Sequence, residues 1–483
     1  MRISVIRGYF RSMEGTVKLK RGDILESVVI GEAVSEGKCI ARSQSLVIFI
    51  AGGVPGDIAD LRIDKIKSSF AEATVVNIHE PSPHRVVPFC EHFGSCGGCT
   101  WQHMTYEMQL QFKQKQVEDA LIRLGKIKIP VVNPILPSAD TRYYRNRLDF
   151  AFSNRRWLTK EEISSGATFD QQALGYHVPK RFDKILDIRK CYLMDDFQNT
   201  LRLAVKEICI TNGYSFFDQI SQQGSMRNMV VRNTTRNEWM AVIIFHEEDK
   251  SIIQNLMGEL ADRFPQITSL LYIINPKRND TFYDLPVNIF KGEDHITEEM
   301  EGLSFRISAK SFYQTNSKQA YTLYKVARDF ACLTGKEIVY DLYTGTGTIA
   351  QFVSAKAKKV IGVEHTPDAI EDAKANSKRN GITNTEFFAG DIKDTLTKEF
   401  VAAHGNPDVV ITDPPRAGMH EKVVQRLNEM LPEKIVYVSC NPATQARDLA
   451  LLDNNYAVEK IQPVDMFPHT THVENVALLI RRS

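Results

Sequence analysis

The pattern of apolar and polar positions changes along the chain, and each pattern predicts a different architecture. Residues 23–77 hold short alternating runs rich in Val and Ile, such as ILESVVI and SLVIFIA, with glycine turns between them. Several short strands at this spacing predict a small closed β-barrel, either a plain structural one or one of the OB-like kind. From Ser317 onward, apolar strand runs alternate with helical segments, which predicts a doubly wound, mostly parallel sheet.

The stretch between these two regions mixes both patterns. Strand-like runs such as RLDFAF and WMAVIIF alternate with helical periodicity at 105–124, 197–209 and 252–263, and PSPHRVVPFC marks a proline-rich joint after the barrel. We therefore expect a multidomain α/β protein. Its predicted parts are an N-terminal extension (1–19), a β-barrel (20–80), a central α+β domain (81–305) and a Rossmann-like domain (306–483).

Composition narrows the class of protein without naming a partner. Hydrophobic residues make up 43% of the 483 residues and charged residues 25%, which is typical of soluble globular proteins and excludes disordered and collagen-like classes. The formal net charge is +1, so any nucleic-acid site has to be local. No apolar run is long enough to cross a bilayer and the N-terminus lacks a secretory pattern, so we expect a cytoplasmic protein with no membrane contact.

Glycines and acids follow four successive strands of the Rossmann-like region. The first strand ends in DLYTGTGTI (341–349), the second in Glu364, the third in Asp391 and the fourth in Asp413. The carboxyl ends of parallel strands meet at the edge of the sheet where such folds bind nucleotide-like ligands, and a carboxylate there can hold a ribose diol. A dinucleotide stays open as the ligand, because Ala350 is tolerated where the third glycine of that motif would stand. Plain helix N-caps are the alternative for Glu364 and Asp391.

A cysteine and a glutamate are the candidates for covalent chemistry. Cys440 ends the fifth strand in SCNPAT, directly before a helix expected to begin near Pro442, whose dipole would stabilise a thiolate and lower the pKa. A buried structural thiol is the alternative. A thiolate that adds to carbon 6 of uracil makes carbon 5 nucleophilic toward an activated methyl group, and a general base must then remove the proton from carbon 5. Glu474, in HVENVALLI, is the candidate base, with an exposed capping carboxylate as the alternative.

Several motifs together resemble the RNA uracil-5-methyltransferases over nearly the whole chain. They are FYQTN (312–316), DLYTGTGT, GVE, DPPRAG (413–418), SCNPAT and HVENV, in the order and spacing of that family. The resemblance implies transfer of a methyl group from S-adenosylmethionine to carbon 5 of uracil, with Cys440 as nucleophile and Glu474 as base. It also implies five residues around the cofactor: Gln314, Tyr343, Glu364, Asp391 and Asp413.

Three of the eight cysteines are clustered. Cys90, Cys96 and Cys99 follow a C-x5-C-x2-C spacing, which can clamp three thiolates onto one metal centre. Spacing alone allows zinc, an iron–sulfur cluster or free thiols. The ribosomal-RNA branch of the family is similar in carrying a [4Fe-4S] cluster, and the resemblance implies Cys191 as the fourth ligand, with zinc as the alternative.

The same branch is similar in beginning with a TRAM barrel. The resemblance therefore implies ribosomal RNA, of the large subunit (23S), as the partner rather than transfer RNA, and no DNA. Basic residues interleaved with aromatics at 141–150 predict phosphate contacts and base stacking, and a solvated strand face is the alternative. The same prediction extends to Arg155, Arg156, Trp157, Lys180 and Arg181.

Other functions stay open beside this one. A transfer-RNA uracil-5-methyltransferase shares the motifs, whereas an RNA cytosine-5-methyltransferase typically has a cysteine in the strand-four motif, which reads DPPR here. An exocyclic-amine methyltransferase typically has an aromatic residue where Arg416 stands. A noncatalytic RNA-binding module of ribosome assembly is the alternative from another class, and the presence of both Cys440 and Glu474 argues against it. The sequence predicts no oligomeric state.

Overall fold

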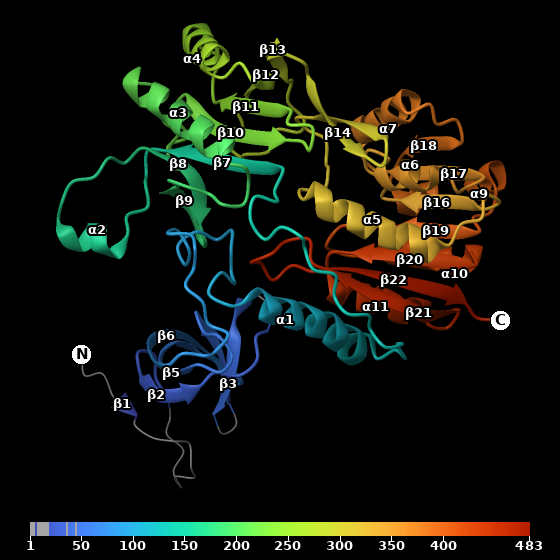
Figure 1. Ribbon diagram of the computed structural model, residues 1–483, viewed down its shortest axis with the longest axis horizontal. Coiled ribbons are helices and arrows are strands. Elements are labelled where there is room, and N and C mark those ends of the chain that lie inside the picture. Colours follow the sequence, from blue (N-terminus) through green and yellow to red (C-terminus); the bar gives the residue numbers. More distant parts are fainter. Residues whose placement is uncertain (1–4, 7–18, 35–36, 44–45) are drawn as a thin grey trace.

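The computed structural model describes residues 5–6, 19–34, 37–43 and 46–483. These residues form three large sheets that follow one another along the chain, with a two-stranded hairpin before the third (Figure 1). The predicted N-terminal extension (1–19) therefore lies outside the described residues, apart from the short strand β1 (Val5–Ile6) and Leu19. Within the described ranges, no helix is both long and apolar enough to span a lipid bilayer.

The first sheet is the predicted barrel. Its strand order is β1-β2-β5-β6-β4-β3. The ring closes where the chain just beyond β2 meets β3: Gly31 N donates to Ile40 O (2.8 Å) and Ile40 N to Glu32 O (2.9 Å). Alternate residues such as Ile48 and Ile50 fill the interior. The strands are β2 (Ile24–Val29), β3 (Cys39–Ser43), β4 (Leu46–Ala51), β5 (Ile58–Ile66) and β6 (Phe70–Glu80).

A helix connects the barrel to the rest of the molecule. After a loop that holds three cysteines, α1 (Tyr106–Asp119) continues into a π-helical segment, η2 (Ala120–Gly125). The buried residues Val117 and Leu121 join the core of the third sheet, against α11 and β21. This part of the predicted central region (81–305) thus packs against the third sheet, as Figure 1 shows.

The second sheet has the order β13-β12-β11-β10-β7-β8-β9. Both helices predicted for this region are present, α3 (Phe197–Thr211) and α4 (Lys250–Arg263), and α2 (Lys160–Ser165) lies in a loop. Every residue of β11 is buried, because alternate side chains enter two different cores. The strands are β7 (Arg147–Ser153), β8 (Ala173–Val178), β9 (Arg181–Asp187), β10 (Met226–Asn233), β11 (Trp239–Phe245), β12 (Ile267–Ile274) and β13 (Asn288–Gly292).

A hairpin and a helix lead into the third sheet. The hairpin is β14 (His295–Met300) with β15 (Leu303–Ser308), and the helix is α5 (Ser317–Ala331). Ile296, Phe305 and Leu323 share one core with residues of both large sheets. The predicted division between residues 305 and 306 lies inside β15.

The third sheet confirms the predicted doubly wound, mostly parallel fold. Its order is β18-β17-β16-β19-β20-β22-β21, and β22 is antiparallel to both of its neighbours. Alternation along the strands divides the faces: Val339 packs toward α5 and α6, and Tyr340 toward the other layer. The strands are β16 (Ile338–Leu342), β17 (Lys359–Glu364), β18 (Thr385–Ala389), β19 (Val409–Thr412), β20 (Lys434–Ser439), β21 (Tyr456–Val464) and β22 (Glu474–Arg481). The helices are α6 (Thr348–Ser354), α7 (Pro367–Arg379), α8 (Ile392–Thr395), α9 (Lys398–His404), α10 (Glu421–Met430) and α11 (Pro442–Leu452).

Candidate functional site

Strand pairing brings the predicted nucleophile and base together. In the antiparallel pair of β20 and β22, Ser439 lies opposite Asn475. The next residue on β20 is Cys440 and the preceding one on β22 is Glu474, so both lie at the same end of adjacent strands. Asp413 directly follows β19, which pairs with the other side of β20. The thiol and both carboxylates therefore meet at one edge of the sheet.

Burial raises the pKa values of the two carboxyl groups at this edge of the sheet. The Glu474 side chain is buried, with only 4% of the residue exposed, and this burial together with the nearby Asp413 raises its pKa to about 8. Burial, with Asp341 close by, raises the pKa of Asp413 to about 7. Arg416 lowers the pKa of Glu474, which opposes the two raising effects. Near neutral pH the Glu474 carboxyl is therefore mostly protonated.

The pKa of Cys440 does not follow the sequence-based expectation. Desolvation by burial and, after it, the Glu474 and Asp413 carboxylates raise this pKa to about 11, although Arg416 acts in the opposite direction. The thiol lies at the start of α11 as predicted, with Asn441 as the N-cap. The loss of hydration and two nearby negative charges outweigh the helix dipole, so the predicted lowering of this pKa is wrong.

The turn after β16 has the geometry of a ligand-binding loop. Tyr343, Gly345 and Gly347 all have positive φ, at 64°, 55° and 74°. A Cβ on Gly347 would come within 2.9 Å of Ala373 and Phe387, whereas one on Gly345 would meet no atom within 4 Å. Gly347 is therefore required for packing against the next helix, and the chain at Gly345 faces open space.

Acids hold this turn in shape. Glu364 accepts hydrogen bonds from Gly345 N (3.1 Å) and Thr366 N (3.0 Å). Asp341 is fully buried and accepts from the Thr344 hydroxyl and from Ala350 N (3.0 Å). Among the residues that the structure describes, Asp341 Oδ1 has no hydrogen-bond partner, and burial raises the pKa of this carboxyl to about 7. An unpaired buried oxygen beside an open turn fits a site for a polar ligand.

The other predicted cofactor residues differ in their surroundings. Asp391 is the N-cap of α8 and forms an ion pair with Lys393, which lowers its pKa, so the predicted alternative of a capping role is what the contacts show. Tyr343 lies near both Asp391 and Glu364; burial first, and then these carboxylates, raise its pKa to about 12. Gln314 is 8% exposed, and its backbone oxygen accepts from Asn146 Nδ2 (2.9 Å).

Sequence reasoning missed several residues that line this edge. Asp341 stands at the start of the quoted DLYTGTGTI run but received no role, although an acid at the end of the first strand was a usable signal. Arg416 enters the sequence analysis only because an aromatic residue is absent at that position, yet its charge lowers the pKa of both Cys440 and Glu474. Tyr324 of α5 is close enough to Asp413, Asp341 and Glu474 for all three to raise its pKa, and nothing in its helical pattern indicates this. Phe312, from the same FYQTN motif as Gln314, has an exposed aromatic ring (68% exposed), which its motif alone did not indicate.

The four predicted metal ligands line one cavity. Cys90, Cys96 and Cys99 come from the loop before α1, and Cys191 follows β9. They share a cavity of about 260 Å³ with other side chains that include His92, Arg145, Tyr176, Lys190 and Tyr192. Burial raises the pKa of Cys96 to about 11 and of Cys99 to about 12, and the neighbouring thiols add to both effects.

Buried side chains hold the Cys191 loop in place. Cys191 N donates to Asn199 Oδ1 (2.8 Å), and Cys191 O accepts from Gln198 Nε2 and Asn199 Nδ2 (both 3.1 Å). Arg202, fully buried on α3, donates to the carbonyls of Ile188 and Arg189. These bonds fix the fourth thiol relative to the second sheet before any metal binds.

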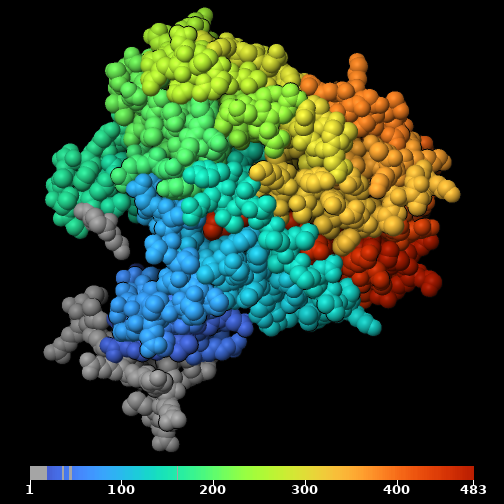
Figure 2. All heavy atoms as spheres, in the orientation of Figure 1, coloured from blue at the N-terminus to red at the C-terminus, as the bar shows by residue number. Residues whose placement is uncertain are grey.

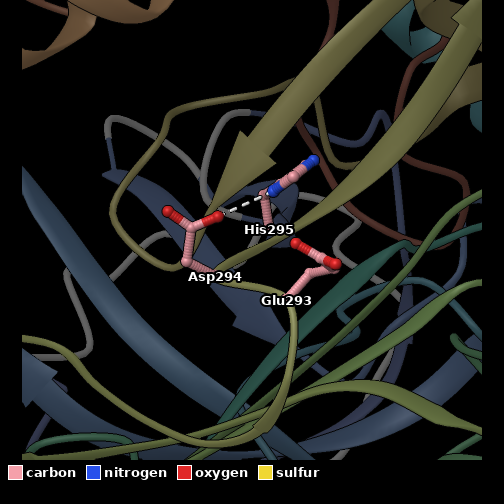
Figure 3. Close-up of side chains that lie close together, drawn as sticks. All are labelled: Glu293, Asp294 and His295. Carbon is pink, nitrogen blue, oxygen red and sulfur yellow. Dashed lines mark hydrogen bonds and ion pairs between the residues drawn. The ribbon is translucent and has the colours of Figure 1, made fainter.

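A second group of potential ligands lies elsewhere. Glu293, Asp294 and His295 come together between β13 and β14, with their ligand atoms within 4.8 Å of one another (Figure 3). Asp294 already contacts His295 (2.7 Å) and forms an ion pair with Arg306. Because Asp294 and His295 are already paired within the chain, we assign no metal to this group.

Most of the basic residues predicted to contact RNA are paired within the chain. Arg147 contacts Asp149 (2.8 Å), Arg155 contacts Asp218 (3.0 Å) and Arg181 contacts Asp183 (3.2 Å). Arg156 is paired with Glu162 in the same way. Arg142 differs, because it is exposed and its guanidinium lies 3.9 Å from the centre of the Phe89 ring. For the paired arginines, the alternative of a solvated strand face fits the contacts better.

Family models and curated relatives match nearly the whole chain. Residues 105–482 match the profile of the family described as tRNA (Uracil-5-)-methyltransferase, and residues 18–76 match the TRAM domain. An uncharacterized RNA methyltransferase of Bacteroides thetaiotaomicron is 57% identical over 449 residues, which are 92% of this chain and 99% of the relative. A second, from Porphyromonas gingivalis, is 53% identical over 462 residues, 94% of this chain and 99% of the relative.

A solved structure is similar over nearly the full length. The Pyrococcus abyssi tRNA (uracil-54, C5)-methyltransferase, in complex with S-adenosyl-L-homocysteine, has a TM-score of 0.72 and 28% sequence identity. The match covers 94% of this chain and 100% of that one. Together with the family match, this shows that the chain belongs to the tRNA (uracil-5-)-methyltransferase family and is an S-adenosylmethionine-dependent RNA (uracil-5-)-methyltransferase with an N-terminal TRAM domain.

Proposed function

We propose that this enzyme methylates carbon 5 of a uracil in ribosomal RNA through a covalent adduct between Cys440 and carbon 6, with Glu474 as the general base. The observation that carries the mechanism is the pairing of β20 with β22, which brings the thiol and a buried carboxylate to the same end of adjacent strands. One group has to attack the base and the other has to remove a proton from the adjacent carbon, so their proximity fits the two steps.

The chemistry requires each side chain in a defined state. Cys440 loses its proton to water, for which its half-buried position leaves access, as its sulfur bonds to carbon 6. S-adenosylmethionine supplies an electrophilic methyl group for carbon 5. Unprotonated Glu474 then takes the proton from carbon 5, and elimination breaks the bond between carbon 6 and sulfur. Because the pKa of Glu474 is about 8, both of its protonation states are populated near neutral pH, as a proton-transfer group requires.

We assign the cofactor to the turn after β16 and to Gln314, Tyr343, Glu364, Asp391 and Asp413. The open space at Gly345 and the unpaired Asp341 Oδ1 support a polar ligand at this turn. The Glu364 carboxylate, already oriented by two backbone N–H groups, fits a ribose diol. Asp391 differs from the other four residues, because Lys393 neutralises its carboxylate.

The proposal includes a [4Fe-4S] cluster on Cys90, Cys96, Cys99 and Cys191. No three of these sulfurs, all of which belong to the described part of the chain, lie within 4.8 Å of one another. A zinc ion with bonds of about 2.3 Å to four thiolates keeps the sulfurs roughly 3.8 Å apart, which is closer than this cavity holds them. The wider spacing supports a cubane cluster, whose role here is to tie the loop before α1 to the second sheet.

Metal analysis of anaerobically purified protein tests the cluster. We expect about four iron atoms per chain, as a cubane cluster contains. Cys191→Ala should lower both iron content and stability, whereas Cys209→Ala, which removes a buried thiol of α3 outside the cavity, should leave iron unchanged. Zinc without iron would contradict the assignment.

The choice of ribosomal RNA needs its own experiment. The TRAM domain and the cysteine cavity support it through the resemblance to the ribosomal branch, but the P. abyssi transfer-RNA enzyme matches this chain over its whole length. Purified enzyme and labelled cofactor should methylate ribosomal RNA from cells that lack the gene, and not transfer RNA from the same cells. The thiolate has to approach the face of the base, so a uridine in a loop should react faster than one in a duplex. Labelled transfer RNA alone would overturn the substrate assignment.

Trapping the covalent intermediate tests the mechanism. Glu474→Gln should complete addition and methylation but retain the proton at carbon 5, so labelled RNA should stay attached to the protein in denaturing electrophoresis. Cys440→Ala should give no attached RNA and no product. Cys332→Ala, which removes an exposed thiol away from the site, is the matched control and should turn over normally. Product formation by Cys440→Ala would sink the covalent mechanism.

A further inference from the structure

A buried ion pair joins helix α1 to the connection between β21 and β22. Lys113 Nζ lies 2.6 Å from Asp465 Oδ1, and both side chains are fully buried. Tyr106, also on α1, donates from its hydroxyl to Asp465 Oδ2 (2.7 Å), and Phe467 N donates to Oδ1 (3.1 Å). Lys113 Nζ also donates to Phe467 O (2.9 Å), so both partners have further hydrogen bonds, which help to offset the cost of removing two charges from water.

Three successive backbone carbonyls of the same connection accept hydrogen bonds from side chains of other segments. Met466 O accepts from Asn316 Nδ2 (3.0 Å), Phe467 O from Lys113 Nζ (2.9 Å) and Pro468 O from the Tyr144 hydroxyl (3.0 Å). Surface loops usually leave such carbonyls to water. Figure 1 shows this red connection reaching away from its sheet toward the blue segment, and in Figure 2 a small red patch lies among blue and cyan atoms.

His469 is the tightest point of the connection. Its φ of 64° is unfavourable for a residue with a Cβ and persists only where the surroundings impose it. His469 N donates to Gln109 Oε1 (2.9 Å), and His469 O accepts from Thr100 N (2.8 Å) and Trp101 N (3.0 Å). Gln109 is itself fully buried on α1. Helix α1 and the chain just before it thus impose the conformation of this turn.

The path from this turn to the proposed base is short. Glu474 is the first residue of β22, and its partner across the sheet is Val464. Val464 directly precedes Asp465, the residue that Lys113 holds. Any shift of Asp465 therefore moves the strand end that pairs with Glu474. Cys440, which follows β20, and the turn after β16 are not paired with this strand end.

From these contacts we infer that Lys113 is a positioning residue for proton removal: through Asp465 it fixes Glu474 relative to carbon 5 of the bound base. This inference rests on the proposed role of Glu474. It assigns a step-specific task to α1, since Glu474 accepts no proton during addition by Cys440 or methyl transfer, while the final proton transfer requires Glu474 within reach of carbon 5. Misplacing a reacting group by about 1 Å can slow a step roughly 100-fold.

Lys113→Met tests the inference, because it removes the charge and keeps most of the length of the side chain. We expect kcat to fall by about 10- to 100-fold with KM for RNA nearly unchanged, and methylated RNA to accumulate on the protein as a labelled band. Tyr106→Phe removes one bond to Asp465, along with the bond that its hydroxyl accepts from Ser138 N, and leaves the ion pair intact. It should shift the same readouts in the same direction by less.

Arg85→Met is the matched control. The half-buried Arg85, from the loop after β6, pairs with the fully buried Asp57 at 2.6 Å. This variant therefore also leaves a buried charged group without its partner, but that group does not belong to the β21–β22 connection. It should lower stability without any labelled band. Should Lys113→Met fail to fold, Tyr106→Phe alone decides.

The outcomes separate the inference from the mechanism on which it rests. If Glu474→Gln traps RNA but Lys113→Met and Tyr106→Phe lose activity without a band, Lys113 supports only the fold and the inference is wrong. If Glu474→Gln itself traps nothing, the proposed base is wrong and the inference falls with it. A band in both α1 variants and none in Arg85→Met supports the positioning role.

Discussion

Each end of the β21–β22 connection has a buried carboxylate, and the two carboxylates differ in their hydrogen bonding. At one end Asp465 is bonded to Lys113, Tyr106 and a backbone N–H group. At the other end Glu474 is equally buried, yet no hydrogen bond or ion pair to its carboxylate is found among the described residues, and its pKa rises to about 8. The difference teaches that burial alone does not define a structural carboxylate: the bonded one holds the fold, and the unbonded one is free to move a proton.

The largest expected effect is on turnover at the unbonded end. Glu474→Gln should slow product release by about 10²- to 10⁴-fold, the usual contribution of a general base, because the amide cannot accept the proton. Asp465→Asn keeps Glu474 and should lose less activity in the fraction that stays folded. Single-turnover assays with labelled cofactor compare the two. Equal losses of activity in the two variants would contradict the distinction between a catalytic and a structural carboxylate.

The second effect is on stability at the bonded end. Asp465→Asn leaves the Lys113 charge buried without its partner, which costs about 3–5 kcal/mol of the free energy of unfolding. Urea denaturation at pH 7 measures the difference. A loss below about 1 kcal/mol would mean that water reaches Lys113 in the variant and that the pair is not the anchor inferred here.

Replacing Glu474, the carboxylate without hydrogen bonds among the described residues, should raise the free energy of unfolding, whereas replacing Asp465 should lower it. The pKa of Glu474 is about 8 in the folded protein against an ordinary 4.5, so the folded state binds the extra proton and loses stability as pH rises through this window. Glu474→Gln cannot ionise and should therefore be more stable than the parent at pH 9, by up to about 5 kcal/mol for a pKa difference of this size, with little difference at pH 5. Thermal melts at both pH values test this. A variant that is less stable at pH 9 would refute it.

The smallest effect is on the pH profile. Turnover should increase as Glu474 loses its proton, with a midpoint near pH 8. Arg416 lowers the pKa of Glu474 and Cys440, so Arg416→Met should move the midpoint upward by roughly one pH unit or less. Initial rates at saturating RNA, measured between pH 6 and 10, give the midpoint. A downward shift would assign Arg416 another task.

Local periodicity was enough to predict the barrel, the helices α1, α3 and α4, and the alternation of strands and helices in the third sheet, but not the β14–β15 hairpin or α5. The run from Glu337 to Leu342 and its successors show strand and helix in alternation, and the acids at strand ends follow from the rule that ligands bind at the carboxyl edge. The pairing of β20 with β22 then confirms that Cys440 and Glu474 meet. These features depend on neighbours in sequence or on the general geometry of a parallel sheet.

Other features depend on contacts between distant segments, and sequence patterns do not contain them. The pKa of Cys440 was predicted with the wrong sign because the folded chain buries the thiol and also brings Glu474 and Asp413 close to it from two other strands. Lys113 reads as an ordinary helical lysine, and its partner lies 352 residues away. The pairing of Arg155 with Asp218 likewise removes a predicted RNA contact through a residue beyond the local pattern.

The place of β22 in the sheet governs when an active enzyme can exist. β22 inserts between β20 and β21, both of which are synthesised before it. Until it arrives, β20 has an unpaired edge, and β21, whose pairing partner among the described strands is β22, is not yet part of the sheet. Such unpaired edges invite incorrect pairing. A nascent chain at this stage already carries Cys440, but it has no Glu474 with which to release a methylated base. Translation thus delays turnover until the strand that closes the gap also brings the base.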